Sequence, residues 1–550
     1  MKIKENNVMK KLTVKSLCVL IIAVMLLSGC GKTENSGNMP LEDKDESVTG
    51  LEYGMSFYEP AVNMSFAVDG APAMPEVEPY FPEFNTEEYS YQKENSFISV
   101  LSNPFSTFAA DVDTASYSNL RRQVLKNEYV DPDSVRVEEL INYFRYSYPQ
   151  PSADEPFGVY TEITVCPWNE KTNLLRIGLQ AKDLDRGAMP KSNLVFLIDV
   201  SGSMDYKNKL PLVQRSFMTL VENLDENDTV SIVTYSSGEK TILDGVKASE
   251  KQEIMAAIEG LYASGSTQGD KAIVMAYDLA KKHFIPGGNN RVIMATDGDF
   301  NVGITSEGEL TRLIADRAKD GVFLSVLGYG MGNYKDSKLE SMADNGNGNY
   351  AYIDSIDEAR KVLVSEAGGT LFTVAKDVKI QVEFNPAMIK GYRLIGYENR
   401  VMAAEDFSDD TKDGGEIGAG HQVTALFEIV PAGSDFDLHE PDSKYSRNDT
   451  PSGDFDGEYC TVNIRYKEPQ GDTSTLLSYT VDETSFKDTP TDDMKWASGV
   501  AEVAMLIKDS AYKGTADFNG AKELLKSVAT DDFRDEFVYL VSKLKNMNGN

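Results

Sequence analysis

A short apolar segment that ends in a carboxylate constrains this chain more than any other feature. Leu194 to Ile198 form an uninterrupted apolar run, Asp199 ends it, and Ser201 and Ser203 follow at alternate positions. A buried strand of this kind brings one carboxylate and two hydroxyls to its C-terminal end. Such oxygens are hard ligands that suit Mg²⁺ or a similar cation. The segment therefore predicts a cation site at the end of a buried strand.

This strand opens a long alternation of apolar strands and amphipathic helices. The strands share an unbroken apolar character and are predicted at Leu194–Asp199, Thr229–Tyr235, Val292–Asp297 and Val322–Gly328. The helices have apolar residues at helical spacing and are predicted near Leu210–Leu224, Lys251–Leu261, Lys271–His283, Glu309–Lys319, Lys338–Asp344 and Asp357–Glu366. Apolar strands separated by helices are typical of a mostly parallel sheet covered on both faces. We predict a doubly wound α/β domain over residues 191–370.

Segments on both sides of this domain have the period of two that half-buried strands require. Such strands are predicted at 158–181, 378–384, 422–431, 459–467 and 475–482. A chain of 550 residues needs more than one core. Because the ends of a domain often lie close together, one domain can be inserted into another. We predict that residues 155–190 and 376–485 form one β-sandwich domain that contains the α/β domain as an insertion.

The remaining folded segments, residues 105–150 and 493–550, are predicted to be helical. Asp113 or Thr114 would cap a helix that runs through Asn127. The neighbouring Asp111 and Asp113 also allow a metal-binding interpretation, but helix capping is the favoured one. C-terminal helices are expected around 495–508, 520–528 and 531–545.

The N-terminus has the features of a bacterial targeting segment. Lys10, Lys11 and Lys15 precede an apolar stretch from Leu17 to Leu27, which is too short to span a bilayer and is typical of a signal peptide. It ends in Leu-Ser-Gly-Cys30, which resembles the lipobox of bacterial lipoproteins, where the cysteine is lipidated. The alternative is a plain cleaved signal with a chance cysteine.

We therefore expect a lipoprotein signal peptide over residues 1–29 and a lipid on Cys30. This predicts a protein of the bacterial cell envelope, anchored by lipid on the extracytoplasmic side. Residues 30–104 show no sustained periodicity and are predicted to be a flexible acidic tether, although their aromatic residues allow docking onto the folded body. The lipid anchor would be the only contact with the membrane.

Three loops of the α/β domain converge if its sheet is parallel, because ligands bind at the C-terminal ends of such strands. Asp199 ends one strand, Asp297 ends another, and Thr267 lies in a loop that opens a helix. Together with Ser201 and Ser203, these residues resemble the metal-ion-dependent adhesion site of von Willebrand factor type A (VWA) domains, which have a Rossmann-like fold. No position departs from that pattern.

The resemblance implies roles for each residue. Ser201, Ser203 and Thr267 would bind Mg²⁺, Mn²⁺ or Ca²⁺ directly, while Asp199 and Asp297 would bind it directly or through water. The remaining coordination position would accept an Asp or Glu carboxylate from a protein partner. Asp299 is a candidate for supporting this set from outside.

Further motifs resemble a bacterial subfamily, the YfbK-type VWA lipoproteins, which carry a C-terminal domain of unknown function. The motifs are spread over the chain from about residue 100 onward, at Phe105–Tyr117, Val137–Phe144, Asn193–Met204, Ala295–Gly303, Tyr392–Arg400 and Gly415–His421. The resemblance implies a fold more strongly than a biological role.

The composition favours a binding protein over an enzyme. The net charge of −33 repels nucleic acid, so no nucleic-acid partner is expected. There are only three histidines, and no zinc-hydrolase, nucleophile-elbow or phosphate-loop motif is found in the sequence. We predict a non-enzymatic protein that binds a partner through its metal site. An envelope scaffold or assembly factor for a membrane complex is the alternative, and a Mg²⁺-dependent hydrolase is the least favoured.

Two further expectations concern the connection between domains. Cys166 and Cys460 occupy opposite faces of their strands, which argues against a disulfide without excluding one. The helix at Asp357–Glu366 runs almost directly into the strand that begins near Lys376. We hypothesise that occupancy of the metal site shifts this helix and reorients the β-domain.

Overall fold

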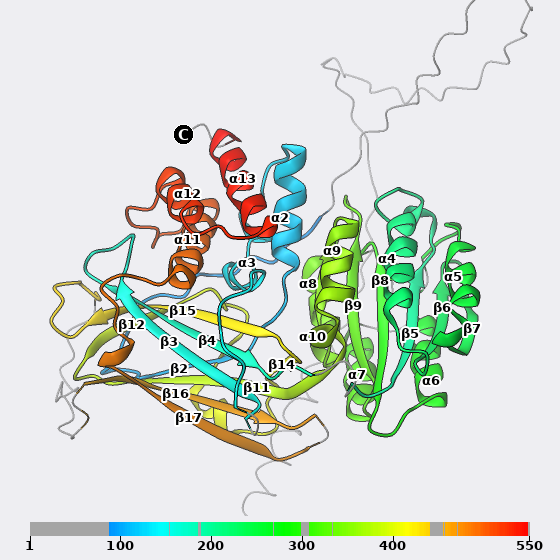
Figure 1. Cartoon of the computed structure of the whole chain (residues 1–550), viewed down its shortest axis with the longest axis horizontal. Helices are drawn as coiled ribbons and strands as arrows, with labels where there is room; N and C mark the ends of the chain where they lie inside the picture. The colour runs from blue at the N-terminus through cyan, green and yellow to red at the C-terminus, as the bar shows by residue number, and fades with distance from the viewer. Residues whose placement is uncertain are drawn as a thin grey trace, which may run out of the picture. The chain divides into compact units, whose positions relative to one another are not determined.

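The computed structural model describes residues 87–152, 155–184, 189–267, 269–298, 307–332, 334–439, 455, 457–469 and 471–547. The predicted signal peptide, Cys30, most of the predicted tether and Asp299 lie outside these ranges. Three β-sheets and the helices around them make up the described part of the chain (Figure 1). No helix in that part is long and apolar enough to cross a membrane.

The α/β domain is built on a six-stranded sheet with the order β10-β9-β8-β5-β6-β7. Its strands are β5 (Ser192–Asp199), β6 (Thr229–Tyr235), β7 (Glu239–Lys247), β8 (Asn289–Thr296), β9 (Phe323–Tyr329) and β10 (Tyr350–Ile353). Neighbours run parallel except for β7, which pairs antiparallel with β6 at one edge. Every residue of β5 is buried, which requires helices on both faces.

Two sets of helices cover this sheet. The set on one face comprises α4 (Leu210–Asn223), α5 (Lys251–Glu259) and α9 (Ile356–Arg360), and the other comprises α6 (Asp270–Lys282), α7 (Glu307–Lys319) and α8 (Asp336–Asn345). The predicted doubly wound, mostly parallel sheet is thus confirmed. The sequence did not predict β7 or β10. The residues of β7 are exposed or half-buried, so this edge strand has no apolar run, and β10 has only four residues, too few to show a pattern.

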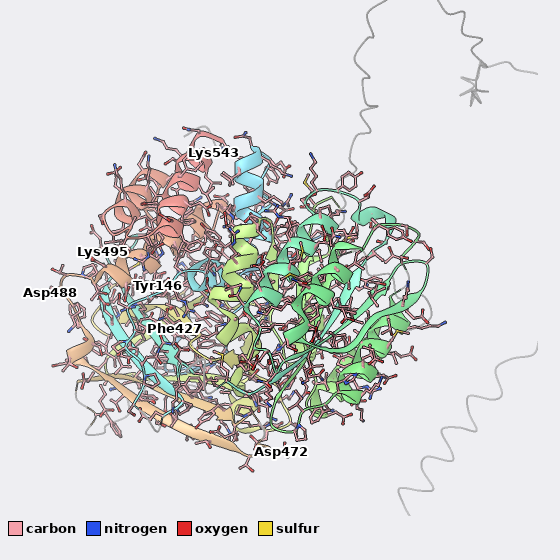
Figure 2. All side chains as sticks on the ribbon, turned by 45° about the vertical axis from the view of Figure 1, so that its right-hand side comes forward. Tyr146, Phe427, Asp472, Asp488, Lys495 and Lys543 are labelled. Carbon is pink, nitrogen blue, oxygen red and sulfur yellow. The ribbon has the colours of Figure 1, made fainter. Side chains whose placement is uncertain are left out.

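Two antiparallel sheets share a second apolar core. The first has the order β1-β12-β15-β4-β3 and consists of β1 (Ile98–Ser99), β3 (Phe157–Val165), β4 (Asn173–Ala181), β12 (Ile389–Ile395) and β15 (Gln422–Pro431). The second has the order β13-β2-β11-β16-β17 and consists of β2 (Phe105–Ala109), β11 (Thr373–Phe384), β13 (Val401–Met402), β16 (Glu458–Lys467) and β17 (Ser474–Asp482), with β14 (Gly415–Gly418) paired to β11. Phe427 of β15 is fully buried in this core, whereas Asp488 lies at the outer edge of the molecule (Figure 2).

Helices from both ends of the described chain pack into one layer. They are α2 (Ala115–Lys126), α3 (Val137–Asn142), α11 (Asp492–Ile507), α12 (Phe518–Lys526) and α13 (Asp532–Met547). Their common core includes Tyr117, Phe144, Trp496 and Phe537, and Leu426 of β15 joins it, so the layer covers the outer face of the five-stranded sheet. Figure 1 shows α13, in red, beside α2, in blue. Segments predicted as separate helical ends therefore form one unit.

The first predicted helical segment, 105–150, begins with a strand instead. Residues Phe105–Ala109 form β2, which lies between β11 and β13 in the six-stranded antiparallel sheet. The alternation of Phe105, Thr107 and Ala109 with Ser106 and Phe108 was too short to identify. Non-local pairing with β11 decides the conformation, as is usual for strands.

Residues at the end of the predicted tether pack against the folded body. Ile98–Ser99 pairs with β12, and the backbone of Glu88 donates to Tyr334 with an N–O distance of 3.1 Å. The Tyr89 hydroxyl accepts a hydrogen bond of 2.6 Å from Asn119 of α2. From residue 87 onward the tether prediction was therefore wrong, and docking of the aromatic residues, the alternative, describes Tyr89. The physical reason is that β12 offers β1 a free edge.

Candidate metal site

Two buried carboxylates lie at the C-terminal edge of the parallel sheet. Asp199 ends β5, Asp297 follows the adjacent β8, and both are fully buried. Asp199 accepts hydrogen bonds from the Ser201 backbone N–H at 2.8 Å and from the Thr296 hydroxyl at 3.4 Å. Burial, and then the charge of Asp297, raise the pKa of Asp199 to about 7. Added positive charge would relieve this unfavourable pair, so the position is electrostatically suited to a cation.

The two predicted serines are held close together beside Asp199. Ser201 immediately precedes a 3₁₀ turn, Gly202–Met204, and Ser203 lies within that turn. Their hydroxyl oxygens lie 3.0 Å apart. Adjacent ligands of an octahedral Mg²⁺ ion, each about 2.1 Å from the metal, are separated by about 3 Å. The spacing of the two hydroxyls therefore fits two neighbouring ligand positions of one hard cation.

The loop that carries Thr267 is fastened to the serine loop. The backbone N–H of Gly202 donates to the Gly265 carbonyl at 3.0 Å, and that of Ser264 donates to the Val200 carbonyl at 2.8 Å. Gly265 has a φ of +80°, and a Cβ there would lie 2.3 Å from the Ser237 hydroxyl, so glycine is required. Thr267 is half-buried two residues later. All three predicted loops thus meet at one edge of the sheet.

Sequence reasoning missed one member of this site, Lys209. Its ammonium donates to Asp297 Oδ2 at 2.8 Å, and the residue is only 5% exposed. Lys209 precedes the first residue of α4, where the partial positive charge of a helix N-terminus disfavours a cation. A lysine at a helix start, next to a predicted carboxylate site, is the signal that would have pointed to it.

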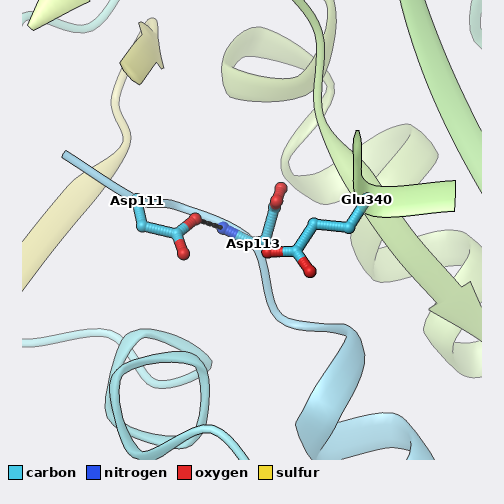
Figure 3. A group of neighbouring side chains, drawn as sticks. All are labelled: Asp111, Asp113 and Glu340. Carbon is cyan, nitrogen blue, oxygen red and sulfur yellow. Dashed lines mark hydrogen bonds between the residues drawn. The ribbon is translucent and has the colours of Figure 1, made fainter. Parts of the chain in front are cut away.

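A second cluster of carboxylates lies between α8 and the β2–α2 connection. Oxygens of Asp111, Asp113 and Glu340 lie within 4.8 Å of one another, and all three residues are buried. Figure 3 shows the hydrogen bond that the backbone N–H of Asp113 donates to the Asp111 carboxylate. The Arg400 guanidinium contacts all three, at 3.2, 3.4 and 3.2 Å, and also Asp344 at 2.8 Å. The positive charge of the Arg400 guanidinium therefore already compensates the carboxylates of this cluster.

The helix-capping interpretation of Asp113 and Thr114 was wrong in its detail. Thr114 precedes α2 but its side chain makes no capping bond, and Asp113 accepts instead from the backbone N–H of Tyr350 in β10, at 2.9 Å. The N–H of Ser116 in the first turn of α2 donates to Glu139 of α3 at 2.8 Å. A carboxylate from a different helix caps α2, which a local sequence pattern cannot reveal.

The histidines and cysteines lie away from these carboxylates. His283 follows α6 and contacts Asp244 of β7 at 2.7 Å. His421 is held near Gly369, and burial lowers its pKa to about 3, so it is neutral. Cys166 and Cys460 are buried free thiols, which answers the open question of a disulfide in the negative.

The last helix of the α/β domain is divided into three parts. α9 is followed by a π-helical turn, Lys361–Ser365, and then by α10 (Ala367–Leu371). β11 of the antiparallel sheets begins at Thr373, after one intervening residue. A cavity of about 1000 Å³ is lined by Leu363–Gly369 and by Ser192, the first residue of β5. This cavity is therefore at the end of β5 opposite Asp199.

Comparison with known proteins agrees with this architecture. The model of the von Willebrand factor type A domain matches residues 193–364, and a model described as von Willebrand factor matches residues 83–176. The model "Uncharacterized protein YfbK, C-terminal" matches residues 369–547. The chain is thus a VWA-domain protein with an additional C-terminal domain.

The particular family follows from a relative that is similar over most of its length. The uncharacterized protein YfbK of Escherichia coli (strain K12) is 40% identical over 471 residues, which cover 83% of this chain and 80% of that protein. This chain belongs to the YfbK family.

More distant similarities are narrower or structural only. The uncharacterized protein sll0103 of Synechocystis is 28% identical over 188 residues, which cover 34% of this chain and 43% of that protein. A von Willebrand factor type A structure from Catenulispora acidiphila is 16% identical, covers 72% of this chain and 91% of its own, and has a TM-score of 0.42.

Proposed function

We propose that this protein is a cell-envelope lipoprotein whose VWA domain binds a protein partner through a divalent cation. The observation that carries the proposal is the 3.0 Å spacing of the Ser201 and Ser203 hydroxyls beside the buried carboxylate of Asp199. These hydroxyls and that of Thr267 would hold Mg²⁺, or Mn²⁺ or Ca²⁺, with Asp199 and Asp297 in support. When bound, the cation offers a coordination position to an Asp or Glu carboxylate of the partner.

The same residues favour capture of a ligand over catalysis. Serine and threonine hydroxyls are neutral ligands, and Lys209 already compensates Asp297. A cation held in this way keeps positive charge for an external anion. His283, which closes α6, lies near the opposite end of the sheet, so this histidine is not placed to act as a general base at the metal. We therefore propose a non-enzymatic role, with the lipid on Cys30 as the membrane anchor.

We interpret the two antiparallel sheets as a β-sandwich that receives the VWA domain as an insertion. β3 and β4 precede the parallel sheet, β11 and later strands follow it, and all contribute to one core. The single residue between α10 and β11 would transmit any shift of the last helix to the sandwich. The π-helical turn supports this proposal, because such turns often mark functional positions in helices.

Partner capture from the organism's own envelope tests the main proposal. Wild-type protein and Asp199→Ala are used as bait, each with Mg²⁺ or with EDTA, and bound proteins are identified by mass spectrometry. We expect a partner that is retained only by wild type in Mg²⁺. Ser266→Ala is the matched control, since it removes a hydroxyl from the same loop as Thr267 and should keep the partner. Partners that survive both EDTA and Asp199→Ala would contradict binding through the metal.

The helix relay has a separate test. Spin labels on exposed positions of the VWA domain and of β17 report the distance between the two domains by pulsed electron resonance. We expect the distance distribution to shift when Mg²⁺ and the captured partner are added together. An unchanged distribution would overturn the relay and leave partner binding intact.

The alternative role, a scaffold for a membrane complex, rests on the predicted anchor at Cys30. It differs in the identity of the captured partners. Envelope proteins of the same cell would support assembly, and proteins of a host or matrix would support adhesion.

A further inference from the structure

The two carboxylates of the candidate metal site are electrostatically different. Asp199 accepts hydrogen bonds from neutral donors, the Ser201 N–H and the Thr296 hydroxyl, whereas Asp297 accepts one from the ammonium of Lys209 at 2.8 Å. Lys209 and Asp297 are both buried. Salt and water therefore screen this ion pair little.

The ammonium is held in place by the surrounding backbone. The stem of Lys209 lies against Gly330, whose φ is +82°, and a Cβ at Gly330 would lie 2.4 Å from Lys209 Cε. The ammonium also lies 5.5 Å from the centre of the Tyr206 ring, which is a favourable cation–π arrangement. Lys209 is thus built into the site, in contrast to a surface lysine that can turn away.

Three charged side chains of the described site add up to one negative charge. With Asp199 ionised, as a bound cation would keep it, Asp199 and Asp297 contribute one each, and Lys209 cancels one of them. A divalent cation would be fully neutralised by two carboxylates, but with Lys209 present one unit of positive charge is left. In a buried site this residual charge strongly attracts an anion, and repulsion between the ammonium and the cation weakens metal binding.

We propose that Lys209 shifts binding energy from the metal to the partner's carboxylate. It lowers the affinity of the free protein for the cation and makes cation and carboxylate bind cooperatively. In this scheme Lys209 does not bind the cation; its ammonium acts by pairing with Asp297 and by repelling the cation. The inference rests on the proposed function, because it requires a cation at Ser201 and Ser203.

The test measures Mg²⁺ binding to the mature chain by isothermal titration calorimetry, with and without acetate as a carboxylate probe. Lys209→Met and Lys209→Gln remove the charge, and the glutamine keeps a hydrogen-bond donor for Asp297 if the methionine variant fails to fold. Lys209→Arg keeps the charge. Lys207→Met is the matched control, because Lys207 is exposed and lies two residues away.

We expect both neutral variants to bind Mg²⁺ about tenfold or more tightly than wild type, as loss of a near charge repulsion requires. Acetate should tighten Mg²⁺ binding in wild type and in Lys209→Arg, and much less in the neutral variants. Lys207→Met should match wild type. Equal or weaker Mg²⁺ binding in Lys209→Gln, or the same gain in Lys207→Met, would overturn the inference alone. Wild type that takes up no Mg²⁺ at all would instead overturn the proposed function, and this inference with it.

Discussion

Two of the buried carboxylate groups among the described residues differ in what they face. At the edge of the parallel sheet, Asp199 accepts a hydrogen bond from the Thr296 hydroxyl and Asp297 pairs with the ammonium of Lys209. Beside α8, Asp111, Asp113 and Glu340 face the guanidinium of Arg400. Arginine presents several donors in one plane and can serve several carboxylates at once, whereas lysine is a compact point charge.

The partners of buried carboxylates distinguish a structural cluster from a candidate metal site. The Arg400 cluster joins α8 of the VWA domain to the β2–α2 connection and to the loop before β13, so it holds parts of the chain together. A second arginine, Arg136, extends it by contacting Asp336 at 2.5 Å and Glu340 at 3.3 Å. The Asp199 site has fewer fixed positive charges and neutral oxygens at the spacing of metal ligands. Counting carboxylates alone would favour the Arg400 cluster as a metal site, although its negative charge already has a fixed partner.

The largest expected effect is the loss of the Arg400 guanidinium. Arg400→Met leaves four carboxylates without their shared partner, and breaking a buried ion pair costs about 3–5 kcal/mol. We expect the free energy of unfolding, measured by urea titration, to fall by that amount. Arg360→Met is the control: Arg360 pairs with Asp357 while both side chains are more than half exposed, so a change within about 0.5 kcal/mol is expected. Equal losses of stability in the two variants would contradict a structural role for the Arg400 cluster.

A smaller effect separates the two clusters by their response to Mg²⁺. A cation that binds only the folded state stabilises it by about 2.7 kcal/mol at a concentration of one hundred times Kd. We expect Mg²⁺ to raise the melting temperature of wild type and of Asp113→Asn, and to leave that of Asp199→Asn unchanged. Because Asp113→Asn lowers stability by itself, the measured quantity is the increment between EDTA and Mg²⁺. A lost increment in Asp113→Asn would assign the metal to the Arg400 cluster.

The smallest expected effect is the pH dependence of stability that Glu138 causes. Glu138 lies next to Glu139 on α3. Burial, then the charges of Glu398 and Asp111, raise the pKa of Glu138 to about 8. The folded state therefore holds this proton more tightly than the unfolded state, whose pKa is ordinary. The contribution of Glu138 is favourable below the ordinary pKa and is progressively lost as pH rises towards 8.

Glu138→Gln should consequently be more stable than wild type at about pH 8.5, where the buried wild-type carboxyl is charged, and the difference should shrink towards pH 5. The neighbouring Glu139→Gln is the contrast, since Glu139 caps α2 through Ser116 and pairs with Arg136. We expect it to lose stability at pH 8.5. Urea unfolding at both pH values measures the two variants, and a wild-type stability identical to that of Glu138→Gln at pH 8.5 would show that Glu138 carries no such cost.

Local patterns were sufficient for four of the six strands of the VWA sheet, β5, β6, β8 and β9. β5, β6 and β8 are apolar runs that a buried parallel strand requires, and the structure places them within a few residues of the predicted bounds. The same holds for α2, predicted through Asn127, which closes the helix with a φ of 55°. Periodicity and turn chemistry act over a few residues, so they can be read directly.

Contacts between distant segments decided the rest. β2 is a strand because β11, far along the chain, pairs with it. α2 packs on α13, and residues 87–104 include β1, which pairs with β12. None of these pairings leaves a local periodic signal, because each depends on the surface offered by another part of the chain.

By itself, the sequence determined the class of the fold and predicted all members of the candidate site except Lys209, since Asp199, Ser201 and Ser203 lie at alternate positions and each predicted loop follows its own strand or opens its own helix. Only the tertiary structure decided which charged side chains lie beside the buried carboxylates. The ion pair between Lys209 and Asp297 joins positions 88 residues apart, and Arg400 meets Asp111 across 289 residues. Electrostatic energy depends on distance in space and on burial, and neither quantity is a local property of the sequence.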